Sequence, residues 1–586
     1  MAKNETRTDN KLKSVDQTSP MGGGSFILYQ CQLVSPSNPT NPVEMNSIGV
    51  FQEMNIYEDL FSNVLRGTLR FLDNQGLAET LPIIGDETLV ISFTTSAAGM
   101  GSKAELGDTL ESGSKSEEAL MQRFKVYDCK EVSTGEITKQ YELFFVSEEY
   151  IHSTKIKMSR GYKGKFYGAP MGSKEGSVVE EAMKKIYKNV NEFYQKKVYI
   201  EKTASPQNLI IPNWTPFQAI NFCASRSLSY NEEDSEIENP EKNQLPNAPG
   251  SLFVFYEKLG TGFFYESIES MIIKQKSQGD IPLYQYTPKL GEGMSNKIGL
   301  AYFAVDQFEI KSSFKTLENL GFGMYGSKLI AYDPIRMKYD EVKYDYYQKE
   351  DNPITEVDDE QTCATIQTTD LSQAKDDSQR IFADFIATDI HPVKRTSNKL
   401  ISSSSEFLGS NDAVIRLATT TRSHDTIFVS PPKPDATDTE TPAVSNTSIG
   451  VSSTTFKDQD SKSNKVENWL LQREVQQQEF GNIVVTFTVS GNSSRHVGDL
   501  VRFEIPTSIP PNDAGTIELG HQLYSGHYIV SKVRHIITPA EYNTDLELIK
   551  NSFAKRIPGQ REEGDFGAVK SGSRLSADGT RVIGGL

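Results

Sequence analysis

The chain has 586 residues and a formal net charge of −17, with 78 acidic against 61 basic side chains. Sequence-specific DNA-binding proteins carry a basic face, so this charge argues against that class. It is compatible with a passage through which DNA slides, because an acidic wall lacks the phosphate attraction that retains a binder. The length suggests roughly three to five domains, and the 25 Tyr and 30 Phe favour β-sheet.

The cysteines and the N-terminal segment bear on where the chain folds. Cys31, Cys129, Cys223 and Cys363 are far apart and form no C-x-x-C pair. We expect small buried hydrophobic side chains rather than a disulfide framework, and folding in a reducing cytoplasm. No stretch approaches the ~18–20 continuous apolar residues of a membrane span, so we expect no membrane insertion. Segment 1–24 is polar, lacks a signal-peptide core and is predicted to be a disordered arm.

Polar low-complexity stretches separate aromatic-rich blocks, and these blocks define the predicted domains. After the arm we expect a small β-barrel or sandwich at 25–157, an α+β domain at 158–292, a β-rich region at 293–429, a flexible insert at 430–464, a β-rich domain at 465–550 and a flexible tail at 551–586. The insert has almost no large apolar residues, so it cannot bury enough surface to offset its ordering entropy. The predicted fold class is mainly β with α+β insertions.

Alternation of apolar and polar side chains predicts a series of strands in the first block. These strands are expected at 25–33, 48–56, 67–72, 88–94, 124–132 and 139–146. In the second strand, Val50, Gln52, Met54 and Ile56 are expected to share one face. The remaining predictions for this block are a short amphipathic piece at 57–61, a turn at 73–76 and a helical turn at 77–81.

Helical spacing of apolar residues appears in the second block and again near the C-terminus. Helices are predicted at 177–193, from Thr215 as N-cap with Pro216 in the first turn, and at 465–480 before Gly481. The segment 370–388 has mixed helical character, and 321–326 is a Gly-rich turn region. Further strands are predicted at 251–257, 262–267, 304–311, 328–332, 338–345, 482–490, 526–533 and 544–550, and 493–505 is predicted to include a turn at 498–501 that leads into a strand.

The histidines and glycines do not form a recognised catalytic or metal-binding motif. His521, His527 and His535 lie close in sequence, but a zinc site would need a fourth ligand that the sequence does not supply. We interpret them as surface or hydrogen-bonded strand residues. The sequence contains no G-x-S-x-G elbow. The Gly-rich segment 321–326 lacks the Lys-Ser/Thr of a phosphate loop.

The acidic pairs are interpreted as solvated rather than catalytic. Glu148 and Glu149 lie at the end of a predicted strand, and 358–360 is an acidic run in a polar loop. A glycosidase needs two carboxylates about 5–10 Å apart across a cleft, which a sequence cannot show. We therefore predict no enzyme activity, no catalytic, cofactor-binding or metal-binding residues, and no cofactor.

Five segments, in the same order along the chain, carry a family resemblance. They are FQEMNIYEDLFSNVLRGTLRFLDNQGLAETLPIIGDETLVISF (51–93), YELFFVSEEYIHSTKIKMSRGYKGK (141–165), LIIPNWTPFQAINFCASRS (209–227) with SLFVFYEKLGTGFFYESIESM (251–271), GFGMYGSKLIAYDPIRMKYDEVKYDY (321–346), and NWLLQREVQQQEFGNIVVTFTVSGNSSRHVGDLVRFEIP (468–506) with LYSGHYIVSKVRHIIT (523–538). On these segments the chain resembles the tail hub proteins of contractile-tailed phages, the family of the T-even baseplate hub.

The resemblance implies two tail-tube-like β-barrel domains plus two smaller domains. The first barrel would be 25–157, the second tube-like region 293–429, and 465–550 would complete the hub. Three chains would form a homotrimer in the tail baseplate of the virion, with six barrels adapting a threefold spike to a sixfold tube. The implied partners are the central spike, the tail tube or its initiator, baseplate wedge proteins, and genomic DNA in transit only.

Two features depart from some relatives, and one alternative stays open. Nothing in the sequence shows the short repeats of a β-helical needle, so a needle would belong to a separate chain. The insert at 430–464 has no family counterpart. The alternative is a carbohydrate-binding or carbohydrate-degrading tail protein, which predicts clustered Trp and paired carboxylates; the chain has only Trp214 and Trp469, and Trp469 is expected in a core.

Overall fold

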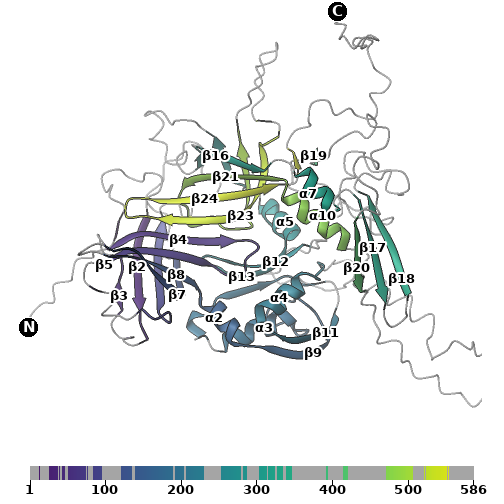
Figure 1. Cartoon of the computed structure of the whole chain (residues 1–586), viewed down its shortest axis with the longest axis horizontal. Helices are drawn as coiled ribbons and strands as arrows, with labels where there is room; N and C mark the ends of the chain where they lie inside the picture. Colours follow the sequence, from purple (N-terminus) through teal and green to yellow (C-terminus); the bar gives the residue numbers. More distant parts are fainter. Residues whose placement is uncertain are drawn as a thin grey trace, which may run out of the picture.

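The computed structural model is mainly β, as the sequence predicts, with large antiparallel sheets and few helices (Figure 1). It describes, apart from short gaps, residues 26–95, 120–229, 252–286, 303–345, 414–419, 470–505 and 521–553, together with 12–13 and 391–392. Within these residues no helix is both long and apolar enough to cross a lipid bilayer.

Fifteen strands form the largest sheet. They are β1 (Leu12–Lys13), β2 (Phe26–Val34), β3 (Val43–Glu44), β4 (Phe51–Asp59), β5 (Arg66–Asp73), β6 (Thr88–Thr95), β7 (Leu120–Thr134), β8 (Lys139–Ser147), β14 (Leu283–Tyr286), β15 (Ala304–Val305), β16 (Phe308–Ser312), β21 (Ile483–Ser490), β22 (Leu500–Glu504), β23 (Gly526–Ile537) and β24 (Tyr542–Lys550). They divide into two halves. The N-terminal half runs in the order β2-β6-β7-β8-β5-β4, and the C-terminal half holds β14, β15, β16, β21, β22, β23 and β24.

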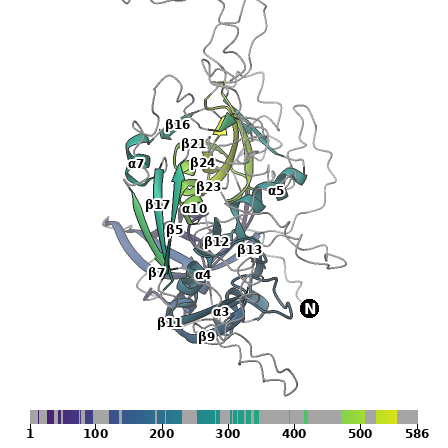
Figure 2. The ribbon, with the colours of Figure 1, turned by 90° about the vertical axis from the view of Figure 1, so that its right-hand side faces the viewer.

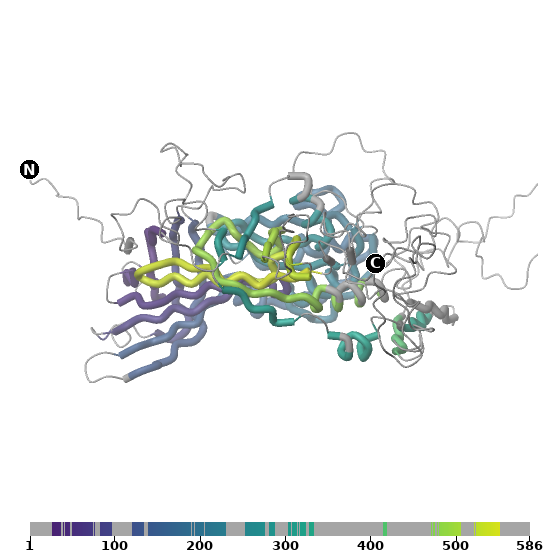
Figure 3. The backbone as a smooth tube through the Cα atoms, turned by 90° about the horizontal axis from the view of Figure 1, so that it is seen from above, coloured from purple at the N-terminus to yellow at the C-terminus, as the bar shows by residue number. Residues whose placement is uncertain are grey.

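The two halves are joined by hydrogen bonds between β4 and β23. These strands are antiparallel, with Asp59 opposite Lys532 and Met54 opposite Ile537. β23 pairs with β22 through its first residues and with β24 along its remaining length. Figures 1 and 3 show β4, β23 and β24 side by side. The two halves therefore share one continuous wall.

The C-terminal half curls round its own apolar core. From β23 the sheet continues through β24 and β21 to β16 on one side, and through β22 and β14 to β15 on the other. The chain passes almost directly from β15 into β16, so the backbone itself links the two branches. Across this junction the rings of Tyr286 and Phe308 meet edge to face, with centroids 5.0 Å apart.

An α+β module packs below both halves (Figure 2). Its helices are α2 (Glu148–Lys155), α3 (Val178–Tyr187) and α4 (Pro216–Ala224), with the short 3-10 helix η1 (Glu192–Tyr194); its strands are β9 (Met158–Lys165), β10 (Lys197–Ile200), β11 (Gln207–Trp214), β12 (Phe253–Lys258) and β13 (Gly262–Ser267). The predicted cap of α4 is confirmed. Thr215 and Gln218 form a reciprocal capping box, and Pro216 occupies the first turn.

The remaining elements lie at the periphery or between modules. They are α5 (Ile268–Gln278), α7 (Thr316–Gly321), α10 (Leu470–Phe480), the three-stranded sheet β18 (Lys338–Asp345), β17 (Gly326–Asp333) and β20 (Ile415–Thr419), and the pair β19 (His391–Pro392) and β25 (Ser552–Phe553). Strand β14 pairs with β22, and β16 pairs with β21, so segments near residues 283–312 complete a sheet with segments near 483–504. The domain limits given above remain predictions.

Most predicted strands are present, but several local predictions are wrong. β4 runs on to Asp59, so 57–61 is not a separate amphipathic piece. A bulge between Phe51 and Glu53 shifts the register. The buried side chains of β4 are Phe51, Met54, Asn55, Ile56 and Glu58, so the predicted face with Val50 and Gln52 is wrong.

Three further local predictions are corrected by the structure. The predicted strand at 304–311 is divided into β15 and β16. Helices α2 and α5 were not predicted; each begins at the residue after a strand, where the apolar pattern of the strand hides the start of the helix. The predictions for 77–81, 358–360 and 370–388 lie outside the described residues.

The close approach of β4, β5 and β8 requires glycine at position 67. A Cβ atom on Gly67 would lie 2.3 Å from the ring of Phe145 and 2.4 Å from the carbonyl oxygen of Asn55. We expect Gly67→Ala to lower the free energy of unfolding by about 1–3 kcal/mol, because the backbone oxygen cannot move aside without breaking the sheet. Urea unfolding of Gly67→Ala beside Gly161→Ala, whose Cβ would meet only Ile210 at 4.0 Å, measures this; equal midpoints would contradict it.

Candidate functional site: a buried polar junction

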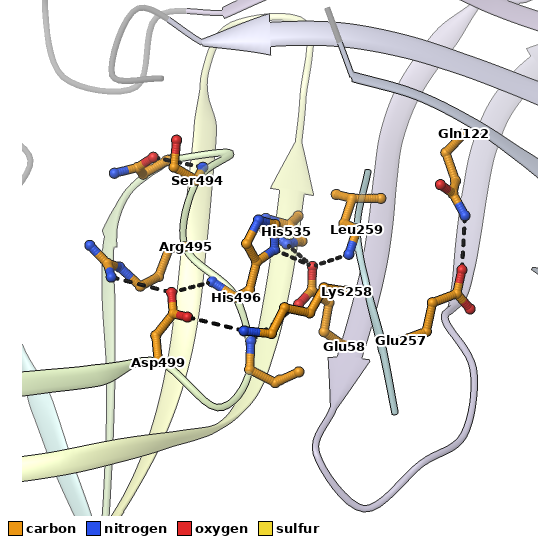
Figure 4. A network of polar contacts seen from close by, with 12 residues as sticks. Glu58, Gln122, Glu257, Lys258, Leu259, Ser494, Arg495, His496, Asp499 and His535 are labelled. Atoms are coloured by element: carbon orange, nitrogen blue, oxygen red, sulfur yellow. Dashed lines mark hydrogen bonds and ion pairs between the residues drawn. The ribbon is translucent and has the colours of Figure 1, made fainter. Parts of the chain in front are cut away.

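A single buried carboxylate lies where the two sheet halves and the α+β module meet. Glu58 is on β4, on the same inward face as Met54 and Ile56, and is 1% exposed. An ionised carboxylate at an inward strand position is costly unless several donors compensate it. The surroundings of Glu58 supply these donors from three separate segments of the chain (Figure 4).

Four groups donate hydrogen bonds to Glu58. Its Oε1 accepts from the backbone N–H of Leu259 at 3.1 Å, and from the rings of His496 at 3.1 Å and His535 at 3.3 Å. Its Oε2 accepts from the backbone N–H of Val497 at 3.2 Å. Leu259 belongs to the β12–β13 turn, His496 and Val497 to the loop after β21, and His535 to β23.

The ring of His535 is held from both sides. Its Nε2 faces Glu58, and its Nδ1 lies 2.7 Å from the hydroxyl of Tyr542. When Nε2 carries the proton, the ring donates a hydrogen bond to the carboxylate of Glu58, and Nδ1 accepts one from the hydroxyl of Tyr542. A neutral ring therefore satisfies both contacts. The phenol ring of Tyr542 also packs edge to face on Phe26 and Phe93, which links this polar chain to the core of the N-terminal half.

The pKa of Glu58 lies well below its ordinary value. Burial alone would raise this pKa, but the charge interaction and hydrogen bond with His496, and the contacts with His535, outweigh burial. A depressed carboxylate pKa contributes stability above the ordinary pKa, and that stability is lost as the pH falls towards the folded value. Glu58 is therefore ionised at neutral pH, and its hydrogen bonds connect the two sheet halves.

The loop after β21 carries a second charged contact beside Glu58. Asp499 accepts a hydrogen bond from the backbone N–H of His496 at 2.9 Å and pairs with Arg495 at 3.3 Å. Lys258 reaches the same carboxylate at 3.4 Å from β12. Asp499 thus fixes the loop that presents His496 and attaches the α+β module to the C-terminal half.

A second buried carboxylate joins the α+β module to the N-terminal half. Glu257, on β12, accepts hydrogen bonds from Leu65 N–H at 3.1 Å, Ser147 Oγ at 2.6 Å and Gln122 Nε2 at 3.0 Å. Lys196 Nζ lies 2.6 Å from Glu257 and 2.8 Å from Glu149. Glu149 is buried on α2, so the prediction that this acidic pair is solvated is wrong for Glu149.

A third buried carboxylate, Glu201, has a different charge balance. It accepts from Ser229 Oγ at 2.6 Å and from Ser267 N–H at 2.7 Å. Burial raises the pKa of Glu201 to about 8, against the opposing hydrogen bonds from these serines, and the nearby Glu266 adds to the rise. The donors to Glu201 named here are neutral hydroxyl and backbone N–H groups, whereas Glu257 also lies 2.6 Å from the ammonium group of Lys196.

The raised pKa of Glu201 predicts a pH dependence of stability. Between its ordinary value of 4.5 and about 8, the folded state holds a proton that the unfolded state releases, so stability falls as the pH rises. Glu201→Gln keeps the protonated shape and removes this titration. We expect the melting temperatures of the wild type and Glu201→Gln to diverge from pH 5 to pH 8, with the wild type falling; the free-energy difference grows by at most about 1.4 kcal/mol per pH unit. Parallel curves would contradict this.

The histidines that are close in sequence do not come together as a site. His535 meets His496 through Glu58, whereas His527 is buried on β23 and His521 contacts Tyr524. His152 pairs with Glu148 on α2 at 3.5 Å. Across the described ranges, no group of three or more metal-binding side chains is present. The side chains of His391 and His424 are outside the described residues.

The cysteine and tryptophan predictions have mixed outcomes. Cys31 and Cys223 are buried thiols without disulfides, as predicted, and Cys129 is half-buried. Trp214 ends β11, is partly buried and packs on Phe222, with ring centroids 4.9 Å apart. Cys363 and Trp469 lie outside the described residues.

The chemistry of this junction is structural. The side chains of Glu58 and His535 are both 0% exposed, so no substrate reaches them from solvent. A carboxylate, an imidazole and a hydroxyl in series are also found in catalytic sites, but there the nucleophile faces a cleft. Here the hydroxyl of Tyr542 points into the interior, and the chain of contacts fixes the orientation of β4 on β23.

Comparison with known proteins gives matches at the level of solved structures. No family model and no curated protein matches the sequence. The tail protein from Neisseria meningitidis MC58 aligns with a TM-score of 0.40 and 7% identity over 89% of this chain and 96% of that chain. The 43 kDa tail protein of prophage MuSo2 from Shewanella oneidensis aligns with a TM-score of 0.39 and 8% identity over 89% and 98%. An E. coli component of the type VI secretion system aligns with a TM-score of 0.31 and 7% identity over 86% and 74%.

Proposed function

We propose that this chain is the structural hub of a phage tail baseplate, and that three copies form a ring that joins the central spike to the sixfold tail tube. The observation that carries the proposal is the continuous wall made by β4 and β23. Each chain presents two sheet halves side by side, so three chains present six. Cyclic closure is the usual outcome for homo-oligomers, and six sheet halves match the symmetry of a sixfold tube.

The buried junction supports this role, because a ring that transmits load needs its two halves held in one orientation. Glu58, Asp499 and Glu257 each connect segments far apart in sequence, and all three involve the β12–β13 hairpin. The resemblance of five ordered segments to tail hub proteins points the same way. On that resemblance the ring would contact the spike, the tube or its initiator, and wedge proteins, with DNA only passing through.

The proposal is tested by the mass and shape of the purified protein. Light scattering is expected to give three times 65.4 kDa, and negative-stain images are expected to show a ring with a central hole. A monomer at micromolar concentration, both alone and mixed with the spike protein, would overturn the trimeric hub. The measurement with the spike protein is needed because the chain could form the same ring only when it assembles on the spike.

A further inference from the structure

The outward face of the shared wall carries a row of charges that neutralise one another. On β8, β5, β4, β23 and β24, side chains alternate between the buried cores and this face. Glu142, Arg70, Glu53, Arg534 and Asp545 occupy outward positions on these five strands in turn. We call these five residues, together with Glu547, Lys532 and Lys311, the ion-pair ladder.

Every step of the first row is an ion pair. Arg70 lies 2.8 Å from Glu142 and 3.6 Å from Glu53. Arg534 lies 3.6 Å from Glu53, across the β4–β23 seam, and 3.4 Å from Asp545. At the end of the row, the carboxylate of Asp545 also accepts a hydrogen bond from the hydroxyl of Thr488 on β21 at 2.6 Å. The row therefore runs without interruption from β8 to β24, across the seam between the two halves.

A second group on the same face has the same character. Glu547, on β24, lies 2.8 Å from Lys532 on β23 and 2.9 Å from Lys311 on β16. Burial would raise the pKa of Glu547, but hydrogen bonds from Lys532 and Lys311 hold it below its ordinary value. The two lysines thus share one carboxylate that stays ionised at neutral pH.

The ladder is balanced in charge and the face is poor in apolar groups. Its acids are Glu53, Glu142, Asp545 and Glu547, and its bases are Arg70, Lys311, Lys532 and Arg534. Among the large apolar side chains exposed in the described residues, only Tyr57, at 38%, belongs to the six strands β5, β4, β23, β24, β21 and β16. A face of this kind offers little to a protein partner, whose interface core is usually depleted in charge.

We infer that the ion-pair ladder lines the channel of the proposed hub and is a non-adhesive surface for double-stranded DNA in transit. This inference rests on the proposed hub function. The wall is shared by both halves of each chain, so in a ring of three its outward face would be repeated round the hole. The passing polyanion then meets the Arg and Lys side chains of the ladder, each already paired with a carboxylate.

The pairing of each cation has a direct consequence for DNA affinity. A protein binds DNA mainly by placing Lys and Arg on phosphates and releasing counterions. Each base of the ladder is within 4 Å of a carboxylate, and phosphate would have to displace that carboxylate first. A purely acidic wall would instead repel DNA and add to the work of ejection. A charge-balanced ladder of paired side chains avoids both retention and repulsion.

Removal of Glu547 provides the sharpest test, because one substitution removes the carboxylate that two lysines share. Glu547→Gln preserves the acceptor for Ser531 and the size of the side chain. We expect the wild-type ring to show weak binding of a fluorescent 20-base-pair duplex in about 50 mM salt, and Glu547→Gln to bind about tenfold more tightly, with a steeper salt dependence. Fluorescence anisotropy measures both quantities.

Two control variants separate the ladder from general charge. Glu318→Gln makes the same change in net charge and releases Lys315, the N-cap residue of α7, and neither residue belongs to the ladder. The second control is the double variant Lys311→Gln, Lys532→Gln, which breaks the same ion pairs but keeps the carboxylate of Glu547. We expect this double variant to bind no more DNA than the wild type. Circular dichroism confirms folding of each variant.

The outcomes distinguish this inference from the hub proposal. A ring whose Glu547→Gln variant binds DNA no better than Glu318→Gln overturns the inference alone, as does an electron-microscopy reconstruction with the ladder on the outer surface of the ring. Tight duplex binding by the wild-type ring also overturns it. A chain that forms no ring in light scattering, even with the spike protein, overturns the hub proposal and the inference together.

Discussion

Replacing Glu58 by Gln is expected to lower the free energy of unfolding by about 3–5 kcal/mol, as when one partner of a buried charged network is removed. Both carboxylate oxygens of Glu58 face donors: three at Oε1 and one, the N–H of Val497, at Oε2. An amide has a single acceptor, so its NH2 group must face an N–H or a ring donor. Urea unfolding at pH 7, followed by tryptophan and tyrosine fluorescence, measures the loss.

The position of Glu58 at the seam gives this substitution a second expected effect. Because the contacts come from both sheet halves, we expect their unfolding to become less cooperative, with a shallower transition. Glu318→Gln, which removes a half-exposed carboxylate from α7, is the matched control and should change stability by less than about 0.5 kcal/mol. A Glu58→Gln protein as stable as this control would show that the junction contributes little.

Replacing Lys196 by Met is the second change with a large expected effect. It leaves Glu149 and Glu257 buried together without the cation that lies within 2.8 Å of both. We expect a loss of about 3–5 kcal/mol at pH 7. Burial raises the pKa of Glu149, Glu257 raises it further, and Lys196 opposes both. Without Lys196 the pKa must rise further, so the variant should recover stability as the pH falls and Glu149 takes up a proton.

Two further variants test the origin of the Lys196 effect. Adding Glu149→Gln to Lys196→Met should restore part of the lost stability, which makes the two substitutions strongly non-additive in a double-mutant cycle. Lys197→Met, at the exposed neighbouring position on β10, should be close to neutral. If Lys196→Met loses the same stability at pH 5 and pH 8, the loss comes from packing and not from the uncompensated carboxylates.

The sequence predicted elements whose pattern is local, and it failed where the pattern depends on distant strands. Strand β13 was predicted with its observed limits, and the cap at Thr215 and Pro216 was predicted from residue types alone. The bulge at Phe51 and Glu53 was not predicted, because it is defined by the partner strand β5. Pairing of β14 with β22 likewise joins residues over 200 positions apart, which periodicity cannot show.

The junction itself left a weaker signal that was present in the sequence. Glu58 follows Met54 and Ile56 at a spacing of two, and His535 lies between Val533 and Ile537, so each polar side chain takes an inward position in an apolar alternation. Such a position predicts a buried polar group. Its partner cannot be predicted, since Glu58 and His535 are 477 positions apart. The fold class was therefore predictable, whereas the contacts that hold its halves together were not.

The pairing of β4 with β23 has a consequence for synthesis of the chain in the cell. β4 leaves the ribosome hundreds of residues before its partner strand, and at about 5–20 residues per second the delay is roughly half a minute to a minute and a half. During this interval the edge of β4 has unpaired N–H and C=O groups, and Glu58 lacks both histidines. Such an edge invites pairing with another nascent chain. Production of this protein should therefore depend on chaperones that cover β4 until translation ends.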